Sequence, residues 1–121
     1  MTRFKSQGFG NTFKNARKGF RLVLKSEMNI RIHIVIASFV LFFAYLLNFS
    51  SLEFCAVLFA IAIVIITEML NTAIEFTLDS VFHNKYSRMV GMAKDISAGA
   101  VMFASFISIF VGLILFGKHL L

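Results

Sequence analysis

The sequence predicts an all-α membrane protein, in which an N-terminal amphipathic surface helix precedes three transmembrane helices. The chain is 59% hydrophobic and contains sixteen Phe and no Pro. Its mean hydropathy of +0.85 is too high for a soluble domain of 121 residues. Three long apolar stretches, separated by short polar segments, supply the candidate spans. We expect a single membrane domain over residues 1–121.

The surface helix is predicted at about residues 9–26, because apolar side chains recur there every three or four positions. These side chains are Phe9, Phe13, Ala16, Phe20 and Leu24. The opposite face carries Lys14, Lys18, Arg21 and Lys25. A basic amphipathic helix of this kind binds the surface of an anionic bilayer. The alternative is a helix that packs on a soluble partner.

The first two spans are predicted at about residues 31–50 and 52–79. A spanning helix needs roughly 20 mostly apolar residues, because it rises ~1.5 Å per residue through ~30 Å of hydrocarbon. The first span satisfies this condition, since after Arg31 it carries no charge except a possible one on His33. The second has only fourteen uncharged residues, from Phe54 to Thr67, so it must continue through Glu68 to reach the other side.

The third span is predicted at about residues 95–117 and carries no charge from Ile96 onward. Small side chains follow one another every four residues along it, so that another helix can approach closely. These residues are Ala100, Ala104, Ser108 and Gly112. A bundle of three spans is thin and screens buried polar groups poorly from lipid. We therefore expect the protein to form oligomers.

The basic residues are distributed very unevenly along the chain. Eight of the twelve Lys and Arg lie in residues 1–31 and three more between the second and third spans, whereas the Asn48–Glu53 connection has none. This distribution argues against nucleic acid as a partner, despite the net charge of +6. The positive-inside rule predicts that the N-terminus and the 79–95 loop are cytoplasmic. Lys118, beyond the third span, is the exception.

Four polar residues of the second span share one helix face. Glu68, Asn71, Glu75 and Asp79 are spaced by three, four and four, which places them within an arc of about 80°. An acidic residue inside a span is costly and usually faces protein, water or a ligand, although Asp79 alone could be solvated at the rim. The other two acids lie toward the negative end of the helix dipole and need a cation nearby. Lys or Arg of a neighbouring helix could supply it, and so could a divalent metal.

Further charged residues are expected on the same side of the membrane. Glu27 and Arg31 lie where the surface helix meets the first span. Lys94 and Asp95 are expected to open the third helix, where a lysine beside free backbone N–H groups makes a phosphate site. Asp95 is equally a normal capping residue. Carboxylates for a metal, a lysine for phosphate and a membrane-level carboxylate for a hydroxyl together indicate phosphoryl transfer, without the motifs of soluble kinases.

These residues carry a resemblance to a known family. The matching runs are Glu68-Met-Leu-Asn71-Thr-Ala-Ile-Glu75-Phe-Thr-Leu-Asp79, Ala93-Lys94-Asp95-Ile-Ser-Ala-Gly-Ala and Glu27-Met-Asn-Ile-Arg31-Ile-His33. Together they resemble the prokaryotic diacylglycerol kinase family, to which undecaprenol kinases also belong. The resemblance implies an ATP-dependent lipid kinase of the bacterial plasma membrane, assembled as a homotrimer whose active sites are shared between subunits.

The resemblance also implies roles for individual residues. Glu68 would be the general base on the lipid hydroxyl, and Glu27 and Glu75 would hold the Mg²⁺ that bridges the ATP phosphates. The residues expected to position nucleotide and phosphates are Asn71, Lys94, Asp95, Tyr86 and Ser87. The last two fall in a loop, Phe82 to Val90, that differs from the family in length and composition.

The acceptor lipid is predicted to be undecaprenol or diacylglycerol. The runs Asn-x-Arg-Ile-His and Lys-Asp-Ile-Ser-Ala-Gly-Ala look more like the undecaprenol-kinase branch. Arg17 also stands where the best-known diacylglycerol kinase has a Trp before Lys18-Gly19. The residues expected at the lipid head group or membrane interface are Arg17, Lys18, Arg21, Arg31 and Asp79.

Two other functions remain open from the sequence. Intramembrane acids also mark ion pathways, so a small transport or proton-coupled protein is an alternative. A pore-former or subunit adaptor would need only the small-residue ridge and the amphipathic helix. The acids of a transport protein would lie near the midplane, without Lys94 and Asp95 opposite, and a pore-former or adaptor would not require a polar face of four residues.

Overall fold

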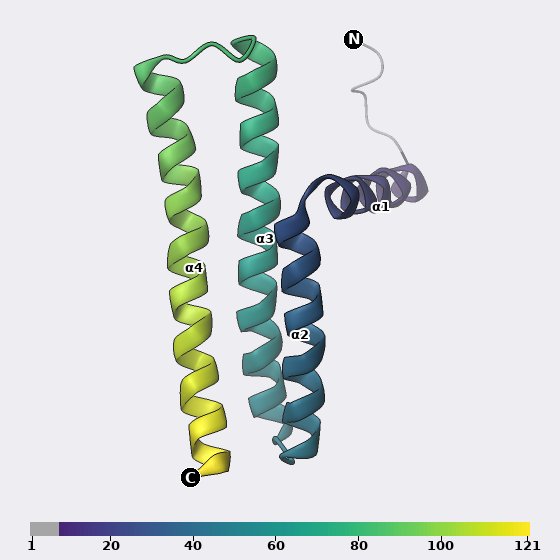
Figure 1. Ribbon diagram of the computed structural model, residues 1–121. Coiled ribbons are helices and arrows are strands. Elements are labelled where there is room, and N and C mark those ends of the chain that lie inside the picture. Colours follow the sequence, from purple (N-terminus) through teal and green to yellow (C-terminus); the bar gives the residue numbers. More distant parts are fainter. Residues whose placement is uncertain (1–7) are drawn as a thin grey trace.

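The computed structural model describes residues 8–121, which form four α-helices and no strand, as the sequence predicts (Figure 1). The helices are α1 (Phe9–Ser26), α2 (Met28–Leu46), α3 (Ser51–Val81) and α4 (Arg88–Leu120). The last three are long and apolar enough to cross a membrane, and the protein is a multi-pass membrane protein. Arg3 and Lys5 of the basic N-terminal segment lie outside the described residues.

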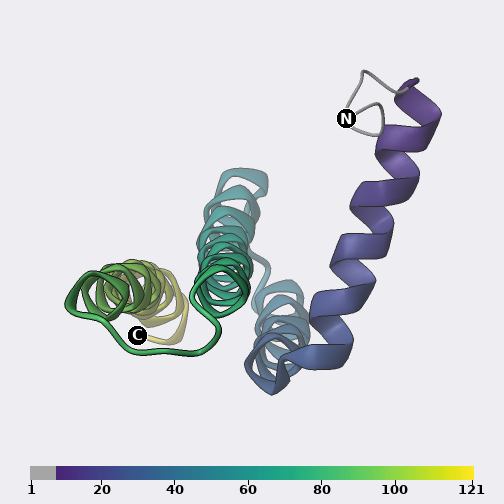
Figure 2. The same ribbon diagram turned by 90° about the horizontal axis from the view of Figure 1, so that it is seen from above.

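A sharp corner at Glu27 separates α1 from α2. Glu27 has extended backbone angles, φ −118° and ψ 112°, and its N–H donates to the Val23 carbonyl at 3.0 Å. Beyond this corner α1 runs away from the bundle, roughly across the direction of the other helices (Figures 1 and 2). Its Phe side chains are exposed, as they would be in a helix lying on a bilayer surface.

The α3–α4 hairpin extends beyond the level of α1 (Figure 1). Its connection is short, and His83 and Asn84 take left-handed backbone angles in it, with φ of 52° and 63°. The Ser87 hydroxyl accepts a hydrogen bond from the Val90 N–H at 3.2 Å and so caps the start of α4. The expectation that Lys94 and Asp95 open the third helix is therefore wrong, because capping by Ser87 starts this helix at Arg88.

A second cluster closes the other end of the bundle. Ser50 and Glu53 form a capping box at the start of α3, with Ser50 N donating to Glu53 Oε1 at 2.8 Å. The same carboxylate accepts from Lys118 Nζ at 3.1 Å and lies 3.0 Å from His119 Nε2. Phe49 is buried and stacks on the His119 ring, with centroids 4.4 Å apart. The end of α4 is thus tied to the start of α3.

The long helices expose large apolar side chains on their outer surfaces. Phe39, Phe59 and Phe103 are examples, one from each of α2, α3 and α4. A water-soluble monomer rarely shows so much contiguous apolar surface. These faces therefore need lipid or other protein against them.

Candidate functional site

The polar face of α3 is turned toward α4 over most of its length. Lys94 Nζ donates to Asp79 Oδ1 at 2.8 Å, and Ser97 Oγ donates to Asn71 Oδ1 at 2.6 Å. Because α3 is continuous through these positions, the contacts follow one another along a single face. Lys94 thus pairs with Asp79, and within residues 8–121 no Lys or Arg forms an ion pair with Glu68 or Glu75, the two acids for which the sequence led us to expect a cation.

Asn71 connects α4 to Glu75. The buried Ser97 hydroxyl donates to the side-chain carbonyl oxygen of Asn71, and Asn71 Nδ2 donates to Glu75 Oε1 at 3.0 Å. The Glu75 carboxylate is thereby held in one orientation, and within residues 8–121 its Oε2 has no hydrogen bond. That oxygen is free to bind a ligand.

Glu68 is the most enclosed acid of this face, with only 7% of its surface exposed. Its Oε1 lies 3.7 Å from the Nε2 of His33, which α2 brings alongside α3. A carboxylate removed from water is unfavourable unless a polar group compensates it, and His33 is the group in position to do so. Glu68 thus lies between α2 and α3, at a distance from the contacts that α4 makes.

The predicted magnesium ligands are placed by different elements. Glu27 lies at the α1–α2 corner, half-buried, and its carboxylate has no hydrogen bond or ion pair within residues 8–121. Glu75 lies on α3, and the described part of the chain brings no three His, Cys, Asp or Glu together as a metal cluster. Magnesium usually takes only one or two carboxylates, with water and phosphate oxygens completing its shell. Glu27 and Glu75 each keep carboxylate oxygens without a hydrogen bond in residues 8–121, and such oxygens are the donors that magnesium takes.

The predicted nucleotide-loop residues have local structural roles. The Ser87 hydroxyl already accepts the hydrogen bond from the Val90 N–H that caps α4. The exposed Tyr86 ring lies over Gly91, where an added Cβ would be 2.8 Å from the Tyr86 Cε2 atom. Glycine at this position lets the ring lie against the first turns of α4. Asp95 is exposed and, among the residues described, pairs with none.

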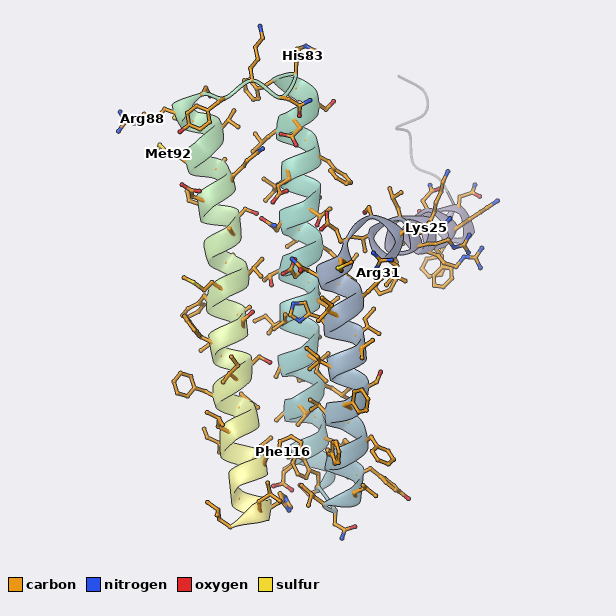
Figure 3. The ribbon with its side chains drawn as sticks, in the orientation of Figure 1. Lys25, Arg31, His83, Arg88, Met92 and Phe116 are labelled. Carbon is orange, nitrogen blue, oxygen red and sulfur yellow. The ribbon has the colours of Figure 1, made fainter. Side chains whose placement is uncertain are left out.

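The residues predicted at the head-group level lie on α1 and near its corner with α2, except Asp79, which lies on α3 and pairs with Lys94. Arg17 and Arg21 line a surface hollow together with Phe13 and Phe20, so that charged and aromatic groups alternate. In Figure 3, Lys25 and Arg31 lie near the corner, His83 and Arg88 at the hairpin end, and Phe116 at the other end of the bundle. Lys18 and Arg31 are exposed. These basic groups thus lie in the half of the molecule that contains the polar face, whereas Lys118 and His119 lie at the other end.

Two site residues were missed by the sequence reasoning. His33 is the one residue of the first span beyond Arg31 that can carry a positive charge, and this was a usable signal. Ser97 follows Lys94 by three residues and so shares its face of α4. Spacing along one helix does not reveal the partner across the bundle, and the contacts to Glu68 and Asn71 had to come from the structure.

Comparison with known proteins gives consistent matches over nearly the whole chain. The model of the prokaryotic diacylglycerol kinase family matches residues 14–116. An undecaprenol kinase of Bacillus subtilis is 33% identical over 108 residues, which cover 89% of this chain and 87% of that protein. A diacylglycerol kinase of Synechocystis is 31% identical over 101 residues, which cover 84% of this chain and 58% of that protein.

Proposed function

The chain belongs to the prokaryotic diacylglycerol kinase family and is a lipid kinase of the membrane, and we propose that it transfers the γ-phosphate of MgATP to the hydroxyl of undecaprenol. The observation that carries the proposal is the row of polar contacts on α3. It runs from the enclosed Glu68, through the Asn71–Glu75 hydrogen bond, to the Asp79–Lys94 pair. This row leads from the level of the bilayer toward the end of the hairpin, as a path from lipid to nucleotide requires.

Each step of the transfer has a residue on this face. Glu68 takes the proton of the lipid hydroxyl, whose oxygen forms a bond to the γ-phosphorus. The bond between that phosphorus and the β,γ-bridging oxygen breaks, and ADP leaves. Lys94, held by Asp79, supplies positive charge to the phosphates. Asn71 holds the Glu75 carboxylate in place.

Magnesium binding is assigned to Glu75 and Glu27, whose free carboxylate oxygens support it. Bound there with ATP, the ion would neutralise phosphate charge during the transfer. Glu27 and Glu75 lie on different elements, and oxygens of the ATP phosphates and of water would supply the remaining ligands of the ion.

The acceptor and the assembly rest on separate observations. Undecaprenol is favoured because the runs Asn-x-Arg-Ile-His and Lys-Asp-Ile-Ser-Ala-Gly-Ala look more like the undecaprenol-kinase branch, and because the chain is 33% identical to an undecaprenol kinase over 89% of its length. A homotrimer with shared active sites is what the family resemblance implies, and the exposed apolar faces of the three long helices leave surface for contact with other subunits as well as with lipid. The bacterial plasma membrane is the proposed location, with the N-terminus and the 82–87 connection in the cytoplasm.

The test is a direct assay of the purified full chain in detergent micelles. Labelled ATP, Mg²⁺ and either undecaprenol or dioctanoylglycerol are supplied, and the product is identified by mass spectrometry. We expect a phosphorylated polyprenol, formed with the higher kcat/KM. Diacylglycerol used with a kcat/KM higher by tenfold, or ~1.4 kcal/mol in transition-state binding, would overturn the acceptor. No phosphorylated lipid from either acceptor, or from a native lipid extract, would overturn the proposed reaction.

A further inference from the structure

The inference concerns His33, a residue that the proposed mechanism does not yet use. Its imidazole is half-buried, with 31% of the side chain exposed, and its Nε2 lies 3.7 Å from Glu68 Oε1. Among residues 8–121 neither side chain has a closer polar partner. The two groups face each other from α2 and α3 at the level where α1 leaves the bundle.

The separation of these two atoms is informative. At 3.7 Å they are too far apart for a good hydrogen bond to each other. They are also too close to hold a water molecule in line between them. One oxygen atom displaced to the side can, however, lie ~2.8 Å from both, which is hydrogen-bond distance. The pair is therefore spaced to share a single oxygen.

A hydroxyl group matches the pair chemically. An alcohol oxygen carries one donor proton and two acceptor lone pairs. The ionised Glu68 carboxylate only accepts, whereas a neutral imidazole protonated on Nε2 donates. The hydroxyl can thus donate to Glu68 and accept from His33 at the same time. Within residues 8–121, Glu68 makes no polar contact with any side chain other than His33.

His33 also borders an apolar cavity of ≈ 400 Å³ between α2, α3 and α4. Its lining residues include Ile36, Val64, Ile65, Ser108 and Phe116. His33 is the first of the α2 residues in this lining, so it marks the end of the cavity nearest Glu68. A lipid chain in the cavity would bring its hydroxyl to the imidazole before any other ionisable group.

From these observations we propose that His33 binds and orients the acceptor hydroxyl, as the hydrogen-bond donor opposite the base Glu68. The proposal rests on the lipid-kinase mechanism above and adds the residue that positions its nucleophile. Donation from His33 to one lone pair directs the hydroxyl proton toward Glu68 and leaves the other lone pair for the γ-phosphorus. The proton goes to Glu68 as before, and His33 keeps its own.

The experiment compares His33→Gln, His33→Asn and His33→Leu with the parent protein. The Gln side chain can place an N–H near the position of the imidazole Nε2, the shorter Asn cannot reach it, and Leu has no donor. Rates are measured with undecaprenol and with dioctanoylglycerol, each varied against saturating MgATP, and MgATP affinity is titrated separately. His83→Asn, in the exposed connection, controls for loss of a histidine elsewhere.

We expect His33→Leu and His33→Asn to lose roughly 10- to 100-fold in kcat/KM for the lipid, the scale of a lost oriented hydrogen bond to a reacting group. We expect His33→Gln to stay within about threefold of the parent, and MgATP affinity to be unchanged in all three. Equal lipid kinetics for His33→Gln and His33→Asn would overturn the proposal, and this comparison remains decisive if His33→Leu does not fold. An inactive parent would instead contradict the proposed function, so the two failures are distinguishable.

Discussion

The hydroxyl of Ser97 donates to the side-chain carbonyl of Asn71 across 2.6 Å, joining α4 to the polar face of α3. Because this bond fixes which end of the amide faces α4, the Asn71 Nδ2 is directed at Glu75, 3.0 Å away. A residue that touches neither nucleotide nor lipid thus sets the orientation of a proposed magnesium ligand. Replacement of Ser97 should therefore weaken the binding of nucleotide.

Ser97→Ala is expected to weaken MgATP binding by roughly tenfold, equivalent to ~1.4 kcal/mol, because the Asn71 amide can then rotate away from Glu75. It should also lower the free energy of unfolding by about 1 kcal/mol, since the half-buried Asn71 carbonyl oxygen is left without its donor. Titration with MgATP and denaturant unfolding measure the two effects. Ser38→Ala is the control, because the Ser38 hydroxyl bonds only to the Ile34 carbonyl of its own helix. Equal MgATP affinity in both variants would contradict the proposal that Ser97 orients Glu75 through Asn71.

Lys94→Ala should raise the KM for MgATP by roughly tenfold and leave the KM for lipid unchanged, because Lys94 lies at the nucleotide end of the polar face. Its pair with Asp79 is partly exposed, so its loss should change stability little. Lys85→Ala is the matched control, since Lys85 is an exposed lysine of the nearby connection with no ion pair in the described chain. Steady-state kinetics with each substrate varied in turn measures the effect. A larger change for lipid than for nucleotide would refute the assignment.

Glu53→Gln should lower the melting temperature and leave kcat within about twofold of the parent. The substitution removes the negative charge shared by Lys118 and His119, while Ser50 can still cap α3 through its own hydroxyl. This cluster lies at the end of the bundle opposite the α3–α4 hairpin connection, so the chemistry should not depend on it. Ser51→Ala, an exposed substitution at the same end, is the control. A fall in kcat of roughly tenfold or more in Glu53→Gln would contradict this prediction and show that the two ends are coupled.

Thiol labelling tests the orientation of the protein in the membrane. In a Cys55→Ser background, a cysteine introduced by Lys85→Cys should react from the cytoplasmic face, and one introduced by Ser51→Cys only from outside. The reason is that Lys25, Arg31 and Arg88 all lie in the half of the molecule that contains the hairpin end (Figure 3). Both positions are exposed, so access does not limit the reaction. The reverse pattern would invert the proposed topology.

The apolar stretches were enough to predict the helices, but not every boundary. The third helix was expected to begin near Asp95 because apolar sequence begins there. Hydropathy marks where lipid contact starts, whereas Ser87 determines where the helix starts, and the polar turns from Arg88 to Lys94 lie between the two points. The polar part of a helix that extends beyond its apolar stretch is therefore mistaken for a loop when hydropathy alone is used.

The polar face of α3 could be predicted because it depends only on spacing within one helix. The contacts across helices could not, because they depend on how α2 and α4 are rotated about their own axes. His33 and Ser97 were both visible as polar residues in apolar surroundings. Their partners Glu68 and Asn71 emerged only when the helices were placed side by side. The unexpected half of the site thus comes from α2 and α4.

The central claim is that the acids of α3 divide the work, with Glu68 serving the lipid hydroxyl and Glu75 the metal and nucleotide. The most direct measurement titrates Glu68→Gln and Glu75→Gln with MgATP and compares affinity with turnover. Glu68→Gln should bind MgATP normally and lose roughly 10²-fold or more in kcat, as expected for a lost general base. Glu75→Gln should lose affinity and turnover together. Near-normal kcat in Glu68→Gln, or a loss of MgATP affinity equal to that of Glu75→Gln, would contradict the account.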